Sequence, residues 1–146
     1  MNKFFHGKFL EAIKLFNSED FYGQHDILEY LWLNLLKSDP RRLVYQGILN
    51  IGVGFYHYTL RNSQDNKNHI RGCKKQLNKG MIRLKQFYEI AKNDKYQFLS
   101  GTIDFEWLKF FIEEVEIWQK WLLNKPDFEK HPVYPKINID TKIKYV

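Results

Sequence analysis

The sequence predicts an all-α protein: a single up-and-down bundle of about five helices, followed by an extended C-terminal tail. Apolar residues recur every three or four positions along most of the chain, which is the spacing of a buried helix face. Short polar segments separate these stretches, so consecutive helices are expected to pack as antiparallel neighbours. No other stretch shows a convincing strand pattern. We expect residues 1–124 to form the bundle domain and residues 125–146 to form the tail.

The helix boundaries follow from the residues that start and stop helices. The first helix is expected over about 6–16 and the second over about 21–36, with Ser18 or Asp20 as its cap. Pro40 suits the start of a third helix over about 41–61, which is glycine-rich and is expected to be the most buried. The fourth is expected over about 69–91. The fifth follows a cap within 103–106 and continues to about Leu123.

Composition limits the classes of function. The chain has 146 residues, 44% of them hydrophobic and 17% aromatic, and a net charge of +6. This is a globular composition, and the positive charge favours an anionic partner. The single cysteine, Cys73, excludes an internal disulfide, and we expect it to be a surface thiol without a catalytic role. No apolar run reaches the ~18 residues of a membrane span, so we expect a soluble protein of the cytoplasm or plastid stroma.

The second expected helix carries an unusual stripe of side chains. His25, Glu29 and Trp32 are spaced i, i+4 and i+7, so they lie along one side of that helix. In the third helix, Gln46, Asn50 and His57 also share a side. If the two helices form an antiparallel hairpin that turns near Asp39, these two polar stripes can meet along one seam. The seam is the candidate functional site of the sequence.

Three interpretations of the seam remain open. It can be a buried hydrogen-bonded network that fixes how the two helices pack, because buried polar groups need partners. It can be a pocket for a small ligand or an anion. It can also be a divalent metal site, with His25, Glu29 and His57 as ligands and Gln46 and Asn50 around them. In the metal interpretation the protein is a metal-dependent hydrolase that uses metal-bound water, with Glu29 or Asp26 as base or ligand.

The same residues resemble the domain of unknown function 309 family, which consists of small all-helical proteins. The family motif H-E-x-x-E-x-x-W stands here as residues 25–32, with Asp26 in place of the glutamate. A second motif, Q-G followed by apolar residues, stands as Tyr45-Gln46-Gly47-Ile48-Leu49-Asn50, and the histidine that follows it is His57. A looser match lies at Gly101-Thr102-Ile103-Asp104. The resemblance implies the helical bundle and the importance of the seam, but it implies no reaction.

Two further surfaces suggest other functions. The fourth helix is rich in cations, and Lys74, Lys75 and Lys79 are candidate contacts for a nucleic acid, although a solvated lysine-rich face is the simpler explanation. The fifth helix carries rings around most of its circumference. A helix that is apolar nearly all round is either buried or part of an interface, so it is a candidate homodimer or scaffold contact. Its rings are Trp107, Phe110, Phe111, Trp118 and Trp121.

Overall fold

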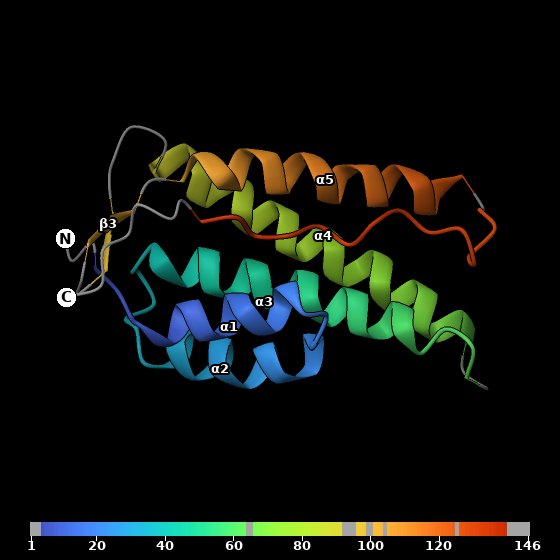
Figure 1. Ribbon diagram of the computed structural model, residues 1–146, viewed down its shortest axis with the longest axis horizontal. Helices are drawn as coiled ribbons and strands as arrows, with labels where there is room; N and C mark the ends of the chain where they lie inside the picture. Colours follow the sequence, from blue (N-terminus) through green and yellow to red (C-terminus); the bar gives the residue numbers. More distant parts are fainter. Residues whose placement is uncertain are drawn as a thin grey trace.

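The described residues form five helices, and the all-α class is confirmed. The computed structural model describes residues 4–63, 66–91, 96–98, 101–103, 105–124 and 126–139. In chain order the helices are α1 (Lys8–Asn17), α2 (Phe21–Leu33), α3 (Arg41–Thr59), α4 (Asn66–Ala91) and α5 (Glu106–Leu123). Figure 1 shows them as an elongated bundle with the C-terminal segment running along it. No helix in the described ranges is long and apolar enough to cross a membrane.

Helix α2 begins as its sequence predicts. The carboxylate of Asp20 accepts a hydrogen bond from the backbone N–H of Gly23 at 2.9 Å, so Asp20 is its N-cap. The preceding residue, Glu19, has a φ of 66°, which lets the chain reverse sharply between α1 and α2. The helix ends at Leu33, three residues before the expected end. After the C-cap, Asn34, the backbone N–H of Leu35 donates to the carbonyl of Trp32 at 3.2 Å.

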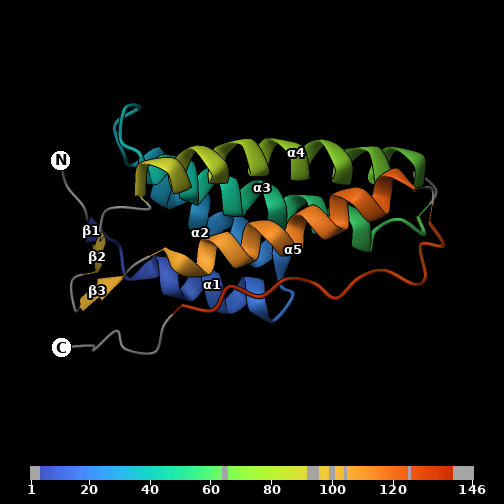
Figure 2. The ribbon, with the colours of Figure 1, turned by 90° about the horizontal axis from the view of Figure 1, so that it is seen from above.

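Helix α3 is the centre of the molecule, as its composition predicts, and it packs against both α2 and α4. Its contact with α4 depends on glycine. A Cβ on Gly80 of α4 would lie 2.7 Å from the carbonyl oxygen of Gly47, and a Cβ on Gly54 would lie 3.2 Å from the carbonyl oxygen of Cys73. The two backbones therefore approach more closely than ordinary side chains allow. The path of α4 along α3 is visible in Figure 2.

A small sheet at one end of the bundle was not predicted. Strands β1 (Phe4–Phe5), β2 (Tyr96–Phe98) and β3 (Gly101–Ile103) pair in that order. β1 is parallel to β2, with Phe4 opposite Gln97, and β2 is antiparallel to β3, with Tyr96 opposite Ile103. The expectation of no strand is therefore wrong at this end. The last residue of the loose third motif, Asp104, lies outside the described residues.

The core is built largely from rings. Phe16 of α1 contacts Phe21, Phe55 and Phe111, with centroids 5.3, 6.3 and 5.5 Å away, so one ring joins four helices. Trp118 of α5 is fully buried and lies 4.9 Å from Phe55. Aromatic pairs at these separations add about 0.5–1.5 kcal/mol each beyond the area that they bury.

Residues 126–139 form no helix and lie against the bundle. The side chain of Asn17 accepts a hydrogen bond from the backbone N–H of Ile137 at 2.7 Å and donates one to its carbonyl at 2.9 Å. The indole of Trp118 donates to the carbonyl of Val133, and its ring stacks on Tyr134 at an interplanar angle of 16°. This segment, called the tail below, therefore covers the ring core, and Ile137 is buried. Residues 140–146 lie outside the described part.

The rings of α5 serve mainly this core. Trp107, Phe111 and Trp118 are buried, and Trp121 is half-buried against Phe128 of the tail. Only Phe110 of the five is exposed, at 62%. The rings that motivated a dimer contact through this helix are thus mostly covered by the chain's own helices and tail.

Candidate functional site

The first half of the predicted seam lies on the surface of α2. The imidazole Nδ1 of His25 is 3.3 Å from the Oδ1 of Asp26 and 3.7 Å from the Oε2 of Glu29. Ligand atoms of these three residues lie within 4.8 Å of one another. His25 and Glu29 are half-buried and Asp26 is exposed, so the group is open to solvent. Its position follows from helix geometry, because residues at i and i+4 are neighbours on one side.

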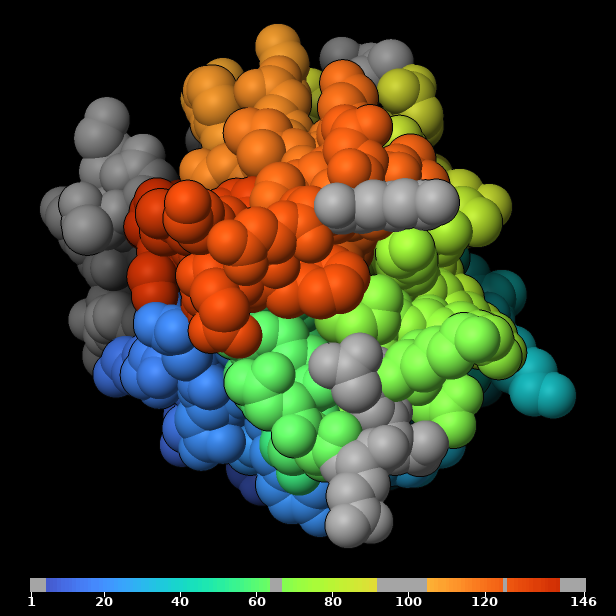
Figure 3. Space-filling view, turned by 90° about the vertical axis from the view of Figure 1, so that its right-hand side faces the viewer, coloured from blue at the N-terminus to red at the C-terminus, as the bar shows by residue number. Residues whose placement is uncertain are grey.

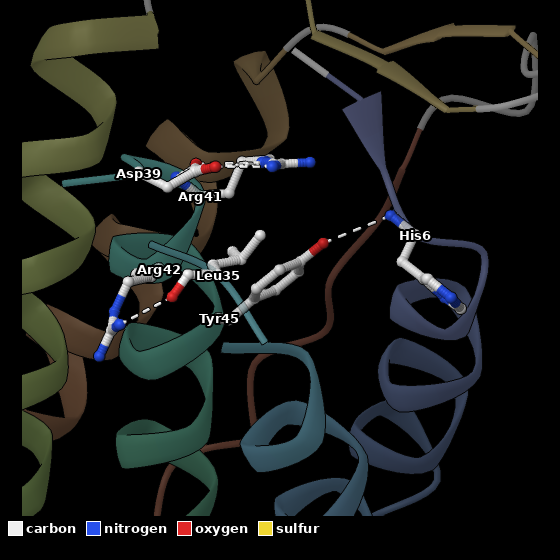
Figure 4. A network of polar contacts seen from close by, with 6 residues as sticks. All are labelled: His6, Leu35, Asp39, Arg41, Arg42 and Tyr45. Carbon is white, nitrogen blue, oxygen red and sulfur yellow. Dashed lines mark hydrogen bonds and ion pairs between the residues drawn. The ribbon is translucent and has the colours of Figure 1, made fainter. Parts of the chain in front are cut away.

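Trp32 and Arg42 join α2 to α3 at the end where the two helices are connected. The guanidinium of Arg42 lies 4.9 Å from the ring centroid of Trp32 and donates a hydrogen bond of 3.0 Å to the carbonyl of Leu35. Figure 4 shows this bond beside the ion pair of Asp39 and Arg41. Gln46 follows Arg42 by one helical turn and is half-buried. This end is therefore held by a cation over a ring and by a hydrogen bond to the carbonyl of Leu35, which lies in the segment between the two helices.

Asn50 is bound to α4. Its amide donates to the Oε1 of Gln76 at 2.9 Å, and its Oδ1 accepts from the guanidinium of Arg83 at 2.5 Å. Asn50 is 9% exposed, so this is a buried polar group with both ends of its amide paired. The contact corresponds to the network interpretation of the seam, but the partners come from the fourth helix instead of the second.

His57 is also turned toward α4. Its Nδ1 lies 3.0 Å from the Nδ1 of His69, and a Cβ on Gly72 would lie 3.1 Å from its ring. One imidazole nitrogen must donate and the other accept, so this contact requires one proton between the two nitrogens. Burial lowers the pKa of His57 below its usual range, and the neighbouring His69 lowers it further.

The residues of the predicted seam are therefore divided between two contacts. The side chain of Gln24 packs on Gly52, and the rings of Tyr22 and Tyr56 are 5.5 Å apart, which fixes the register of α2 along α3. In this register His57 lies level with the start of α2, and it is not part of the group that His25 and Glu29 form. Asp26 takes its place there.

A second candidate site lies where α4 begins. A pocket of about 340 Å³ is lined by three cations, Lys67, Arg71 and Lys74, and by two apolar residues, Ile70 and Phe128. The cations follow the spacing i, i+4 and i+7 and come from one side of α4. Figure 3 shows this end of the molecule, where the orange tail lies beside the green ends of α3 and α4. The sequence indicated Lys74 but missed the pocket, because Phe128 reaches it only through the fold of the tail.

Lys75 and Lys79 of the predicted nucleic-acid set do not line this pocket. At about 100° per residue, Lys75 lies about 40° and Lys79 about 80° beyond Arg71 around the helix axis. Both are exposed. The candidate set of Lys74, Lys75 and Lys79 thus spans two stripes, of which one borders the pocket.

Cys73 is not the surface thiol that we expected. It is fully buried, and burial raises the pKa of its thiol to about 12. Burial outweighs the effect of the neighbouring Lys74, which lowers that pKa. The thiolate that a nucleophile requires is therefore disfavoured at neutral pH.

Comparison with known proteins supports the motif. The family model described as Domain of unknown function (DUF309) matches residues 9–69. The matched segment contains nearly all of α1, the whole of α2 and α3, and the first turn of α4. Searches of curated proteins and of solved structures found no significant match. The resemblance to the DUF309 family that the motif at 25–32 predicts is therefore confirmed over residues 9–69.

Proposed function

We propose that the protein is a non-catalytic binding module for a small anion, and that the pocket at the start of α4 is its binding site. The observation that carries the proposal is the set of three cations around one pocket. Among the described residues, no ion pair or hydrogen bond engages the side chains of Lys67, Arg71 or Lys74. Other cations do have carboxylate partners. The Nζ of Lys85, for example, lies 3.2 Å from the Oε1 of Glu116.

The position of the pocket on the helix adds to its affinity for an anion. Lys67 lies in the first turn of α4, where free backbone N–H groups and the helix dipole favour negative charge. Ile70 and Phe128 add an apolar wall, so the pocket suits an anion attached to an apolar or ring-shaped group. Its volume of about 340 Å³ is at the lower end of the range of small-molecule sites.

Titration with inorganic pyrophosphate tests the proposal. We expect binding that weakens steeply with added salt, because the contacts are between charges. The triple variant Lys67→Glu, Arg71→Glu, Lys74→Glu should lose it. The matched control is Lys75→Glu, Lys79→Glu, which changes charge on the same helix at two residues that do not line the pocket, and it should keep most of the affinity. Equal loss in both variants, or no binding by the wild type at low salt, would contradict the proposal.

A divalent cation bound to α2 is a second candidate function, favoured by the closeness of His25, Asp26 and Glu29. One imidazole nitrogen and two carboxylates suit zinc or manganese, and three protein ligands leave positions for water, as in metal sites that act on a substrate. Titration with Zn²⁺ should show one site that is lost in His25→Ala and kept in His57→Ala. Retention of the metal by His25→Ala would exclude this group as the ligand.

A further inference from the structure

The outer side of α3 is a largely apolar surface that the other described elements leave partly exposed. Six of its residues, at spacings of three and four, form a stripe of half-buried side chains between α2 and α4, and four of the six are apolar. The opposite side of the same helix is the buried core. Helix α3 is therefore apolar almost all round, which is typical of a helix that is covered on every side. The stripe consists of Arg42, Gln46, Leu49, Val53, Tyr56 and Leu60.

The two helices that border this stripe carry opposite charges. Between Phe21 and Leu33, α2 has Asp26 and Glu29 and no lysine or arginine. Helix α4 has several lysines and arginines and one carboxylate, Glu89. Lys79 and Arg83 lie on the side of α4 near the stripe, because Arg83 bonds to Asn50 of α3. The surface thus has an acidic edge, an apolar centre and a basic edge.

The charged groups of the two edges lie at the same level along α3. On one side Gln24 packs on Gly52 and Arg42 lies over Trp32, so Asp26 and Glu29 are level with the middle of α3. On the other side the partners of Asn50 are Gln76 and Arg83, and Lys79 lies between these two in the helix. The acidic and basic groups are therefore opposite each other across the stripe.

From these observations we infer that a second copy of this chain covers the stripe and forms a two-fold symmetric homodimer. A two-fold axis parallel to α3 places α2 of one copy on α4 of the other, and repeats that contact on the other edge. Asp26 and Glu29 then face Lys79 and Arg83 of the second copy, while Leu49, Val53 and Tyr56 meet their equivalents at the centre. Such a self-complementary contact closes on itself and does not extend into fibres.

The size of the surface agrees with a stable dimer. Nineteen residues of α3 span roughly 28 Å, at 1.5 Å per residue. Adjacent helix axes are about 8–10 Å apart, so α2 and α4 widen the surface to roughly 18 Å. The projected area of this surface is on the order of 500 Å². Because side chains protrude from it, its solvent-accessible area is larger and approaches the ~800 Å² per partner of a specific interface.

The oligomeric state of charge variants tests the inference, measured by light scattering in a buffer with a chelator. We expect twice the chain mass for the wild type at micromolar concentrations. Lys75 is exposed and lies one helical turn before Lys79, so it extends the basic edge, whereas Arg83 is left unchanged because it bonds to Asn50. The acidic-edge variant Asp26→Lys, Glu29→Lys and the basic-edge variant Lys75→Glu, Lys79→Glu should each be monomers with unchanged helical circular dichroism. The matched control Lys14→Glu, Lys109→Glu changes exposed lysines of α1 and α5 and should stay dimeric.

A mixing experiment separates this contact from any other. Each edge variant places like charges together twice in its own dimer, but a mixed pair places opposite charges together twice. Mixing the two monomeric variants should therefore restore the dimer mass. A monomeric wild type, a dimer that survives both edge changes, or a mixture that stays monomeric would overturn the inference. Pyrophosphate binding by the monomeric variants tests the proposed function independently of the dimer, because Asp26, Glu29, Lys75 and Lys79 do not line the pocket.

Discussion

Gly80 of α4 faces Gly47 of α3 so closely that a Cβ on Gly80 would lie 2.7 Å from the carbonyl oxygen of Gly47. Helix propensity alone predicts that Gly80→Ala stabilises the protein by about 1 kcal/mol. The close backbone contact predicts the opposite, because overpacking costs about 1–3 kcal/mol and a backbone oxygen moves only with its helix. We expect the free energy of unfolding in urea to fall.

Gly7→Ala is the control for this prediction. Gly7 precedes α1, has a helical φ of −57° and has no atom within 4 Å of an added Cβ. Its replacement should change the free energy of unfolding by only a few tenths of a kcal/mol. If Gly80→Ala is as stable as the wild type, α3 and α4 can separate slightly without loss, and the glycine contact is not a packing constraint.

Asn50 is expected to be more important for stability than its polar character suggests. The change Asn50→Leu removes the acceptor of Arg83 and the donor to Gln76, and it leaves both groups partly buried. An unsatisfied buried group costs about 1–3 kcal/mol. Thermal unfolding should therefore begin at a lower temperature in this variant. Asn78→Leu, which loses only an exposed contact with Gln119, should have a much smaller effect.

The pair of His57 and His69 makes stability depend on pH. Because burial and His69 lower the pKa of His57 in the folded state, the unfolded chain binds a proton more readily. The contribution of His57 to the free energy of unfolding is fully present above its pKa in the unfolded chain, which is about 6.5. This contribution is lost as the pH falls from there through the lower pKa of the folded state. Chemical unfolding at several pH values should show this loss of stability. In His57→Gln the free energy of unfolding should depend less on pH. An equal dependence on pH in both proteins would show that His57 is not the group responsible.

Asn17 is expected to control how firmly the tail lies on the bundle. Its side chain makes both hydrogen bonds to Ile137, so Asn17→Ala removes two bonds at once. Hydrogen exchange of the backbone amides near Ile137 should become faster, while exchange in the middle of α3 should change little. The control is Ser18→Ala, which removes only a local bond to Leu15. Unchanged exchange at Ile137 in Asn17→Ala would show that apolar contacts alone hold the tail.

The sequence predicted those parts of the fold that depend on local patterns. The positions of all five helices and the cap at Asp20 follow from apolar spacing and from side chains that bond to nearby backbone. The sheet was missed for the same reason. Its strands are two or three residues long, and β1 finds its partner at residues 97 and 98, so no local window contains the pattern.

The site was predicted less well, because a helix has several sides and each faces a different neighbour. The hairpin of α2 and α3 is present, but Asn50 and His57 are rotated toward α4 instead of α2. One signal in the sequence indicates this rotation. Gly72 and Gly80 are eight residues apart on α4, which is just over two helical turns, so they lie on the same side of the helix. Glycines at such positions allow a neighbouring helix to come close. The basic pocket depends on Phe128, whose position follows only from the path of the tail.

The two hydrogen bonds between Asn17 and Ile137 join residues that are 120 positions apart. During synthesis on the ribosome, α1 to α5 emerge while the side chain of Asn17 is still hydrated and the indole of Trp118 still faces water. The indole gains its partner, the carbonyl of Val133, and Asn17 gains its partner, Ile137, only after these residues have left the exit tunnel. A nascent chain stalled before that point therefore leaves the aromatic core without the segment that covers it.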